Sequence, residues 1–138
     1  MSTRKYLPTF SELIDRLSIV QLKEIFIPEN KSAYRQEISD IISDLDSIIS
    51  EKDINITGDM IRAVLMIMLS NRYIWENESA ARKGTDQDAG LLKKTHSING
   101  VRNTAKNVIS KEIGERVDLK VDCLAADLQG EHENWNVF

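Results

Sequence analysis

The sequence predicts an all-α protein, built as a four-helix bundle or as paired helical hairpins, with a short fifth helix as an option. Three observations predict this class. Apolar residues recur every three or four positions in four long segments. Only six Gly and two Pro interrupt 138 residues, too few for the many turns of an all-β chain. Apolar residues make up 41% and charged residues 29%, which is typical of one folded domain over 1–138 rather than a disordered chain.

The first helix is predicted over 10–26. Thr9 is placed to cap it, and Glu12 can reach back to the Thr9 amide in a capping box. The apolar residues of this segment then follow helical spacing. Pro8 and Pro28 bracket the segment, and Pro28 suits the first turn of the next helix.

Two further helices follow. One is predicted over 30–51, because its apolar residues step by four, three, four and three positions, as in a heptad seam. Another is predicted from 60 to about 81, with Thr57 as its cap. Its first part, Met60–Leu69, is apolar nearly all round except for Arg62, which is typical of a central helix or of one shared with another subunit. We therefore expect the protein to self-associate.

The fourth helix is predicted from 91 to about 117. Residues 118–128 either prolong it or form the short fifth helix. The ends of the chain are predicted to be an extension over 1–8 and a tail over 130–138, which either frays or docks on a partner. The apolar stripe of the fourth helix consists of Ile98, Val101, Ala105 and Val108, joined by Leu91 and Ile109.

Composition and motifs exclude several classes of protein. A net charge of −4 argues against a nonspecific nucleic-acid binder. No apolar stretch is long enough for a membrane span, no signal peptide is visible, and the lone Cys123 favours a reduced, cytoplasmic compartment. His96 and His132 share no metal-ligand spacing with Cys123, and no Gly-rich phosphate loop or nucleophile elbow occurs. Catalytic residues, metal ligands and cofactors are therefore not predicted.

The strongest candidate for a binding site lies on the fourth helix. His96, Asn99, Asn103 and Lys106 share one helical face, and Arg102 flanks that face on the side nearer the core. Asn and Gly each cost roughly 0.5–1 kcal/mol relative to Ala in a helix, so their abundance here needs a reason beyond local propensity. Amide, imidazole and cationic groups together suit a phosphate or a polar ring edge. The alternative is a polar interface between helices.

Two other clusters contain candidate ligand contacts. Trp75 beside Arg72 could stack on a base, although a core Trp next to an ordinary Arg72–Glu76 surface ion pair explains the same pattern. In the first helix, Asp15 and Arg16 stand among apolar residues. They either face a polar pocket or form the exposed stripe of an amphipathic helix.

Acidic residues raise an enzymatic alternative. Helical nucleotide pyrophosphatases hold Mg²⁺ with carboxylates at helical spacing, because hard cations need several oxygen ligands. The second helix carries such a face, but no base or Lys accompanies it, so a solvated surface is the preferred interpretation. The carboxylates of that face are Glu37, Asp40, Asp44 and Glu51.

Three short patterns carry a resemblance to known proteins. They are Phe10-Ser11-Glu12-Leu13-Ile14-Asp15-Arg16-Leu17-Ser18-Ile19, Trp75-x-x-Glu78-x-x-x-Arg82 and Asn99-x-x-Arg102-x-x-x-Lys106. Across 10–26 and 70–113 the chain resembles short uncharacterised helical proteins of large tailed phages, and also uncharacterised helical domains found near bacterial glycosyltransferases. The phage resemblance implies a small accessory protein in the host cytoplasm that acts on host metabolism or defence. Several such proteins are oligomers that bind nucleotide immune signals without cleaving them.

Together these observations predict an oligomeric protein that binds and sequesters a phosphorylated, nucleotide-like small molecule. One alternative is a Mg²⁺-dependent nucleotide pyrophosphatase using Glu37, Asp40, Glu76 or Glu78. Another is a protein–protein interaction module that works through Met60–Leu69 and the tail Trp135–Phe138. The predicted ligand-binding residues are Arg16, Arg72, Trp75, His96, Asn99, Arg102, Asn103 and Lys106.

Overall fold

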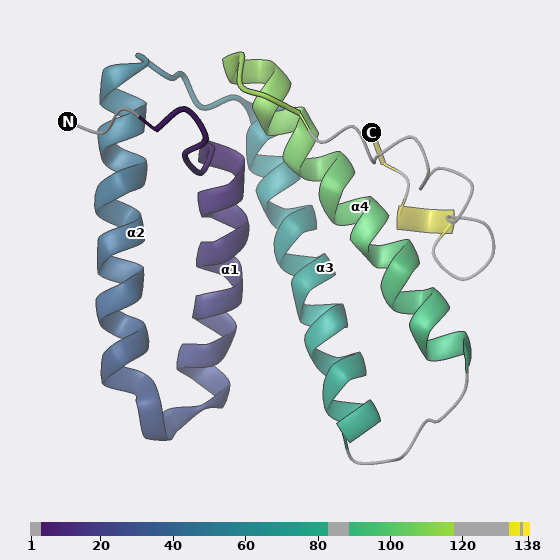
Figure 1. Cartoon of the computed structure of the whole chain (residues 1–138). Helices are drawn as coiled ribbons and strands as arrows, with labels where there is room; N and C mark the ends of the chain where they lie inside the picture. Colours follow the sequence, from purple (N-terminus) through teal and green to yellow (C-terminus); the bar gives the residue numbers. More distant parts are fainter. Residues whose placement is uncertain (1–3, 83–88, 118–132, 136) are drawn as a thin grey trace.

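The computed structural model of the chain describes residues 4–82, 89–117, 133–135 and 137–138. These residues form four α-helices and no strand, which confirms the predicted all-α class (Figure 1). The α-helices are α1 (Phe10–Phe26), α2 (Lys31–Glu51), α3 (Gly58–Arg82) and α4 (Ala89–Ile113), and two short 3₁₀ turns are η1 (Pro28–Asn30) and η4 (Glu133–Trp135).

The four helices are arranged as two antiparallel hairpins. One hairpin is α1 with α2 and the other is α3 with α4, and the two lie side by side (Figure 1). Helix α1 contacts all three other helices, whereas α2 packs mainly on α1. Polar groups that α1 turns toward the second hairpin are therefore enclosed by α3 and α4.

The start of α1 follows the predicted bounds, and Thr9 caps it. The Thr9 hydroxyl accepts a hydrogen bond from the Glu12 amide at 3.2 Å and donates one to the Glu12 carboxylate at 3.0 Å. In a capping box, the Glu12 carboxylate would accept a hydrogen bond from the Thr9 backbone amide. Here it accepts one from the Thr9 hydroxyl instead. The next free amide, that of Phe10, donates to both carboxylate oxygens of Glu115, at 2.9 and 3.0 Å. A residue beyond the end of α4 therefore completes the cap of α1.

The fourth helix ends earlier than predicted. It stops at Ile113 rather than near Val117, because Gly114 adopts a left-handed conformation with φ of 76°. The Glu115 amide then donates to the Ser110 carbonyl at 2.8 Å, as in a Schellman motif. The predicted fifth helix over 118–128 lies outside the described residues.

The core lies where α1, α3 and α4 meet and where the C-terminal half of α2 closes over them. The predicted stripe of α4 is buried at Ile98, Val101, Ala105 and Ile109, each at most 3% exposed. The enclosed side chains of the main cluster are Phe10, Ile14, Met60, Ala63, Ile67, Ala105 and Ile109, with Leu45, Ile48 and Ile49 packed against it.

The segment Met60–Leu69 is buried on one side only. Met60, Ala63 and Ile67 face the core, while Leu65 and Leu69 are 59% and 52% exposed. This helix is therefore not enclosed within a single copy of the chain.

The described residues at the C-terminus lie against α3 of the same chain. The ring of Trp135 is edge-on to that of Tyr73 at 6.0 Å, and the guanidinium of Arg62 lies 5.7 Å from the ring centre of Phe138. Within the described part of the chain, no helix combines the length and the hydropathy that crossing a membrane requires.

Candidate functional site

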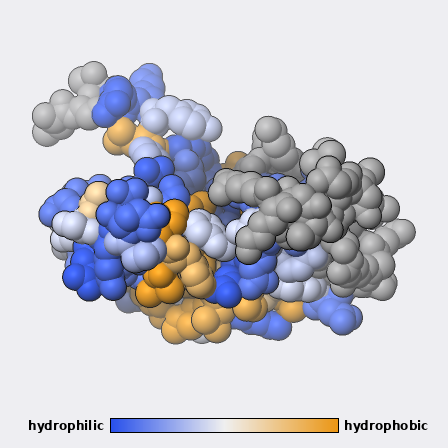
Figure 2. All heavy atoms as spheres, turned by 90° about the horizontal axis from the view of Figure 1, so that it is seen from below, coloured by the Kyte–Doolittle hydropathy of each residue, from blue (hydrophilic) through white to orange (hydrophobic). Residues whose placement is uncertain are grey.

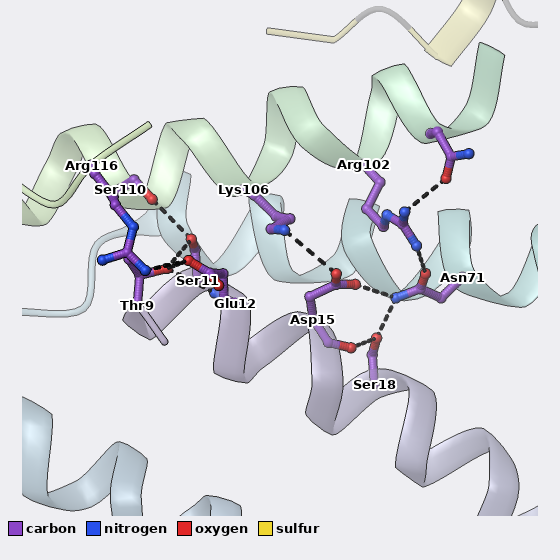
Figure 3. Close-up of polar contacts among 11 residues, drawn as sticks. Thr9, Ser11, Glu12, Asp15, Ser18, Asn71, Arg102, Lys106, Ser110 and Arg116 are labelled. Carbon is purple, nitrogen blue, oxygen red and sulfur yellow. Dashed lines mark hydrogen bonds and ion pairs between the residues drawn. The ribbon is translucent and has the colours of Figure 1, made fainter. Parts of the chain in front are cut away.

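A network of polar side chains joins α1, α3 and α4 (Figure 3). The guanidinium of Arg102 donates to Asn71 Oδ1 at 2.9 Å and to Asn99 Oδ1 at 2.8 Å. The amide of Asn71 donates in turn to Asp15 Oδ1 at 2.7 Å and to the Ser18 hydroxyl. Asn71 is only 4% exposed, so these partners replace the water that burial removes.

Lys106 extends this network from α4 toward α1. Its Nζ lies 3.6 Å from Asp15 Oδ2, and the two side chains are 18% and 14% exposed. The pair is too long for a direct hydrogen bond, so its attraction is electrostatic. With Arg102, the network holds two cations and one carboxylate, so its formal charge is positive.

Arg102 is not fully satisfied by these contacts. Its Nε is buried and has no hydrogen-bond partner among the described residues. A guanidinium has five N–H donors, and an unpaired buried donor carries a desolvation cost. The network is therefore richer in donors than in acceptors, which favours an additional negative group.

A hollow of about 370 Å³ adjoins the network on the surface of α1. Lys106 and Asp15 belong to both features. Two more cations, Arg16 and Lys23, line the hollow together with the carboxylate of Glu12. The apolar part of the lining consists of Pro8, Leu13, Ile19 and Val20.

Helix α2 holds the two outer cations of this hollow in place. Arg16 forms an ion pair with Glu37 of α2 at 2.7 Å, although the Arg16 side chain is 65% exposed. The Lys23 ammonium lies 6.0 Å from the centre of the Tyr34 ring. The hollow itself is lined by α1 and by Lys106 of α4, and α2 contacts only these two cations at its edge.

A second set of contacts fixes α1 against the end of α4 (Figure 3). The hydroxyls of Ser11 and Ser110 lie 2.9 Å apart in the core. Arg116 pairs with Glu12 at 3.1 Å, and Glu115 pairs with Lys52 of the α2–α3 connection at 3.2 Å. These contacts set the distance between the α1 and α4 sides of the hollow.

The structure brings some of the predicted ligand-binding residues together and separates others. Asn99, Arg102 and Lys106 share the network, and Arg16 lines the adjoining hollow. On the same helix, His96 is exposed and Asn103 is half-buried.

Arg72 and Trp75 form a different cluster. The Arg72 guanidinium lies 4.5 Å from the ring centre of Phe26, and its Nε donates to Glu76 at 2.8 Å. The Trp75 ring lies 6.0 Å from the same Phe26 ring. These two residues thus contact the end of α1, and Trp75 is partly buried there.

Asn71 and Ser18 were not among the predicted site residues. Asn71 follows Ile67 by four positions and so falls on the buried side of α3, where an amide among apolar residues needs partners. That placement is the feature of the sequence that could have identified it. Ser18 carries no comparable pattern, because serine is common on both faces of helices.

Three of the carboxylates considered for a magnesium site have partners elsewhere. Glu37 pairs with Arg16, Asp40 accepts a hydrogen bond from Gln36 at 3.0 Å, and Glu76 pairs with Arg72. Over the described ranges, no three His, Cys, Asp or Glu side chains are grouped as metal ligands.

The network and the hollow thus form one continuous polar site that shares Asp15 and Lys106. Comparison of this chain with protein-family models, with curated proteins and with solved structures finds no match. The chemistry available at the site is binding of an anion by ammonium and guanidinium groups, next to apolar side chains that can contact a ring.

Proposed function

We propose that this protein binds and sequesters a small phosphorylated, nucleotide-like molecule without cleaving it. The observation that carries the proposal is the hollow on α1, with its three cations and its link to the buried network. Arg16, Lys23 and Lys106 outnumber the carboxylates of Glu12 and Asp15, so the lining is formally positive although the whole chain is negative. A local positive field in an acidic protein concentrates small anions at that place.

The size and lining of the hollow also support a nucleotide-like ligand. Pockets for small molecules span roughly 300–1,000 Å³, and this one is about 370 Å³. Leu13 and Ile19 are only partly buried and offer an apolar surface for a ring, while the cations suit a phosphate.

A second hollow, of about 630 Å³, differs from the α1 hollow in the charge of its lining. It runs along α2 and is lined by serines, Ile42, Asp46 and Glu51. Its described lining carries two carboxylates and no cation, so it repels an anion. The α1 hollow is therefore the better place for a phosphate.

In this proposal Lys106 contacts the ligand directly and Arg102 acts through its neighbours. The Lys106 ammonium is at the boundary between network and hollow, and its 3.6 Å separation from Asp15 leaves its donors available to a phosphate. Arg102 orients Asn71, and Asn71 fixes the Asp15 carboxylate that faces Lys106. Arg102 and Asn99 are thus positioning residues.

Calorimetric titration with ATP and AMP tests the proposal. Replacing Lys106 by Met keeps the aliphatic stem and removes the charge, so we expect Kd to rise by about tenfold or more. Lys111→Met is the matched control, because Lys111 is an exposed residue of the same helix outside the hollow. Its affinity should match that of the wild type.

Recovery of the nucleotide after denaturation separates binding from catalysis. Intact ATP supports sequestration, whereas AMP and pyrophosphate would support the pyrophosphatase alternative. Binding that is absent at millimolar nucleotide, or equally weakened by both lysine substitutions, would contradict the proposed site. Melting curves of both variants establish that each remains folded.

A further inference from the structure

An uncovered apolar face runs along α3 on the side opposite the core. Ile61, Leu65 and Leu69 are spaced by four residues and therefore line one side of the helix. They are 54%, 59% and 52% exposed, and Val64 beside them is 38% exposed. Single exposed apolar residues are ordinary, but a continuous row of them on one helix marks an interaction surface.

The apolar face continues onto the end of α1. Phe26 is 43% exposed and Ile25 is 61% exposed. The Arg72 guanidinium lies 4.5 Å from the Phe26 ring centre, which places Phe26 beside the turn of α3 that follows Leu69. Figure 2 views the molecule from below, the end at which α1 finishes, and shows apolar residues gathered there.

We infer that this face joins two copies of the chain in an antiparallel, twofold-symmetric dimer. A standard interface buries about 800 Å² per partner, of which about 60% is apolar. Six half-exposed aliphatic and aromatic side chains offer on the order of 500 Å² of apolar surface, which meets that need. This inference does not depend on the proposed ligand.

The order of residues along the face makes it complementary to itself. Its centre lies near Leu69, so a twofold axis there places Leu69 against Leu69 of the second copy. Phe26 of one copy then lies against Leu65 of the other. At the edges, Arg62 of each copy meets Glu76 of its counterpart, so the charges also match in the antiparallel orientation.

Both edge residues keep exposed surface, although each has a contact within its own chain. Arg62 is exposed with its guanidinium beside the Phe138 ring, and Glu76 keeps 59% of its side chain exposed despite its ion pair with Arg72. A parallel arrangement would instead bring Arg62 beside Arg62 and Glu76 beside Glu76. Like charges in contact disfavour that orientation.

Sedimentation equilibrium of the full chain at tens of micromolar tests the dimer. We expect the wild type at about twice its chain mass of 15.7 kDa. Leu69→Glu places two carboxylates together at the axis and should raise the dimer Kd by at least about tenfold. Ile42→Glu is the matched control, because Ile42 is a 46% exposed apolar residue of α2 outside this face. It should leave the dimer unchanged.

A charge exchange tests the orientation. Arg62→Glu and Glu76→Arg should each weaken the dimer, and their combination should restore it to within about threefold of wild type. A monomeric wild type, or a dimer that tolerates Leu69→Glu, would overturn the inference. If the double variant dimerises no more tightly than the Arg62→Glu and Glu76→Arg single variants, the antiparallel orientation is overturned. Circular dichroism establishes that each variant keeps its helices.

Discussion

Asn71 occupies a position that the helical pattern of α3 would assign to an apolar side chain. Its amide joins three helices, because it donates to Asp15 and Ser18 of α1 and accepts from Arg102 of α4. One buried side chain thus links α1 to both helices of the second hairpin. Its contribution lies in satisfying partners that would otherwise be buried and unpaired.

Replacing Asn71 by Ala should therefore lower the free energy of unfolding by about 1–3 kcal/mol, since Arg102 and Asp15 lose a partner inside the protein. Urea unfolding followed by circular dichroism measures this change. Asn103→Ala is the matched control on α4. Asn103 is half-buried and Ala is the better helix former, so stability should stay the same or rise by up to about 0.5 kcal/mol. An equal loss of unfolding free energy in both variants would contradict the role of Asn71 as the link between the helices.

At the scale of the helices, the ends are determined partly by neighbours and partly by distant residues. Thr9 and Thr57 cap α1 and α3 from adjacent positions. Glu115 caps α1 from the other hairpin, and it can do so because Gly114 turns the chain sharply after Ile113. The end of α4 and the start of α1 thus form one connected unit.

The two glycines at helix ends should respond differently to substitution. Gly114 has a positive φ of 76°, so Gly114→Ala should cost about 1–2 kcal/mol and disturb the Glu115 cap. Gly58 has open space at its Cβ position and no positive φ, so Gly58→Ala should be neutral or slightly stabilising. Thermal melts of the two variants compare them directly. A Gly114→Ala protein as stable as Gly58→Ala would show that the turn does not require the left-handed conformation.

At the scale of the whole molecule, charge is separated between surfaces. The outer hollow of α2 carries Asp46 and Glu51, while the hollow on α1 carries three cations. This separation lets a chain of net charge −4 offer a positive site to a small anion. The exposed row on α3 lies on a third surface, so the proposed dimer face and the proposed ligand site have only α1 in common.

Chelation tests the part that divalent metals play in the whole protein. Because Glu37 and Glu76 are held in separate ion pairs and no described carboxylates are grouped as metal ligands, EDTA should change neither the melting temperature nor the affinity for AMP. Differential scanning fluorimetry and calorimetry with and without EDTA give both values. A large loss of either on chelation would favour the magnesium-dependent alternative.

The sequence by itself determined the helical class, the bounds of α1, the caps at Thr9 and Thr57, and the buried stripe of α4. These features depend on residues close together in the chain, through periodicity, capping and helix propensity. It also singled out the segment that holds Arg102 and Lys106, because several Asn residues and a Gly are poor helix formers in the middle of a helix.

Only the tertiary structure decided what those polar groups contact. Arg102 meets Asn71 across 31 positions of sequence, and Glu115 meets Phe10 across 105. The packing of the two hairpins, rather than local spacing, brings such residues together. The same packing places Lys106 beside a hollow and Trp75 at the end of α1, whereas Asn99 meets Arg102 through local helical spacing. Periodicity predicts the face of a helix on which a residue lies, but the neighbouring helix determines what covers that face.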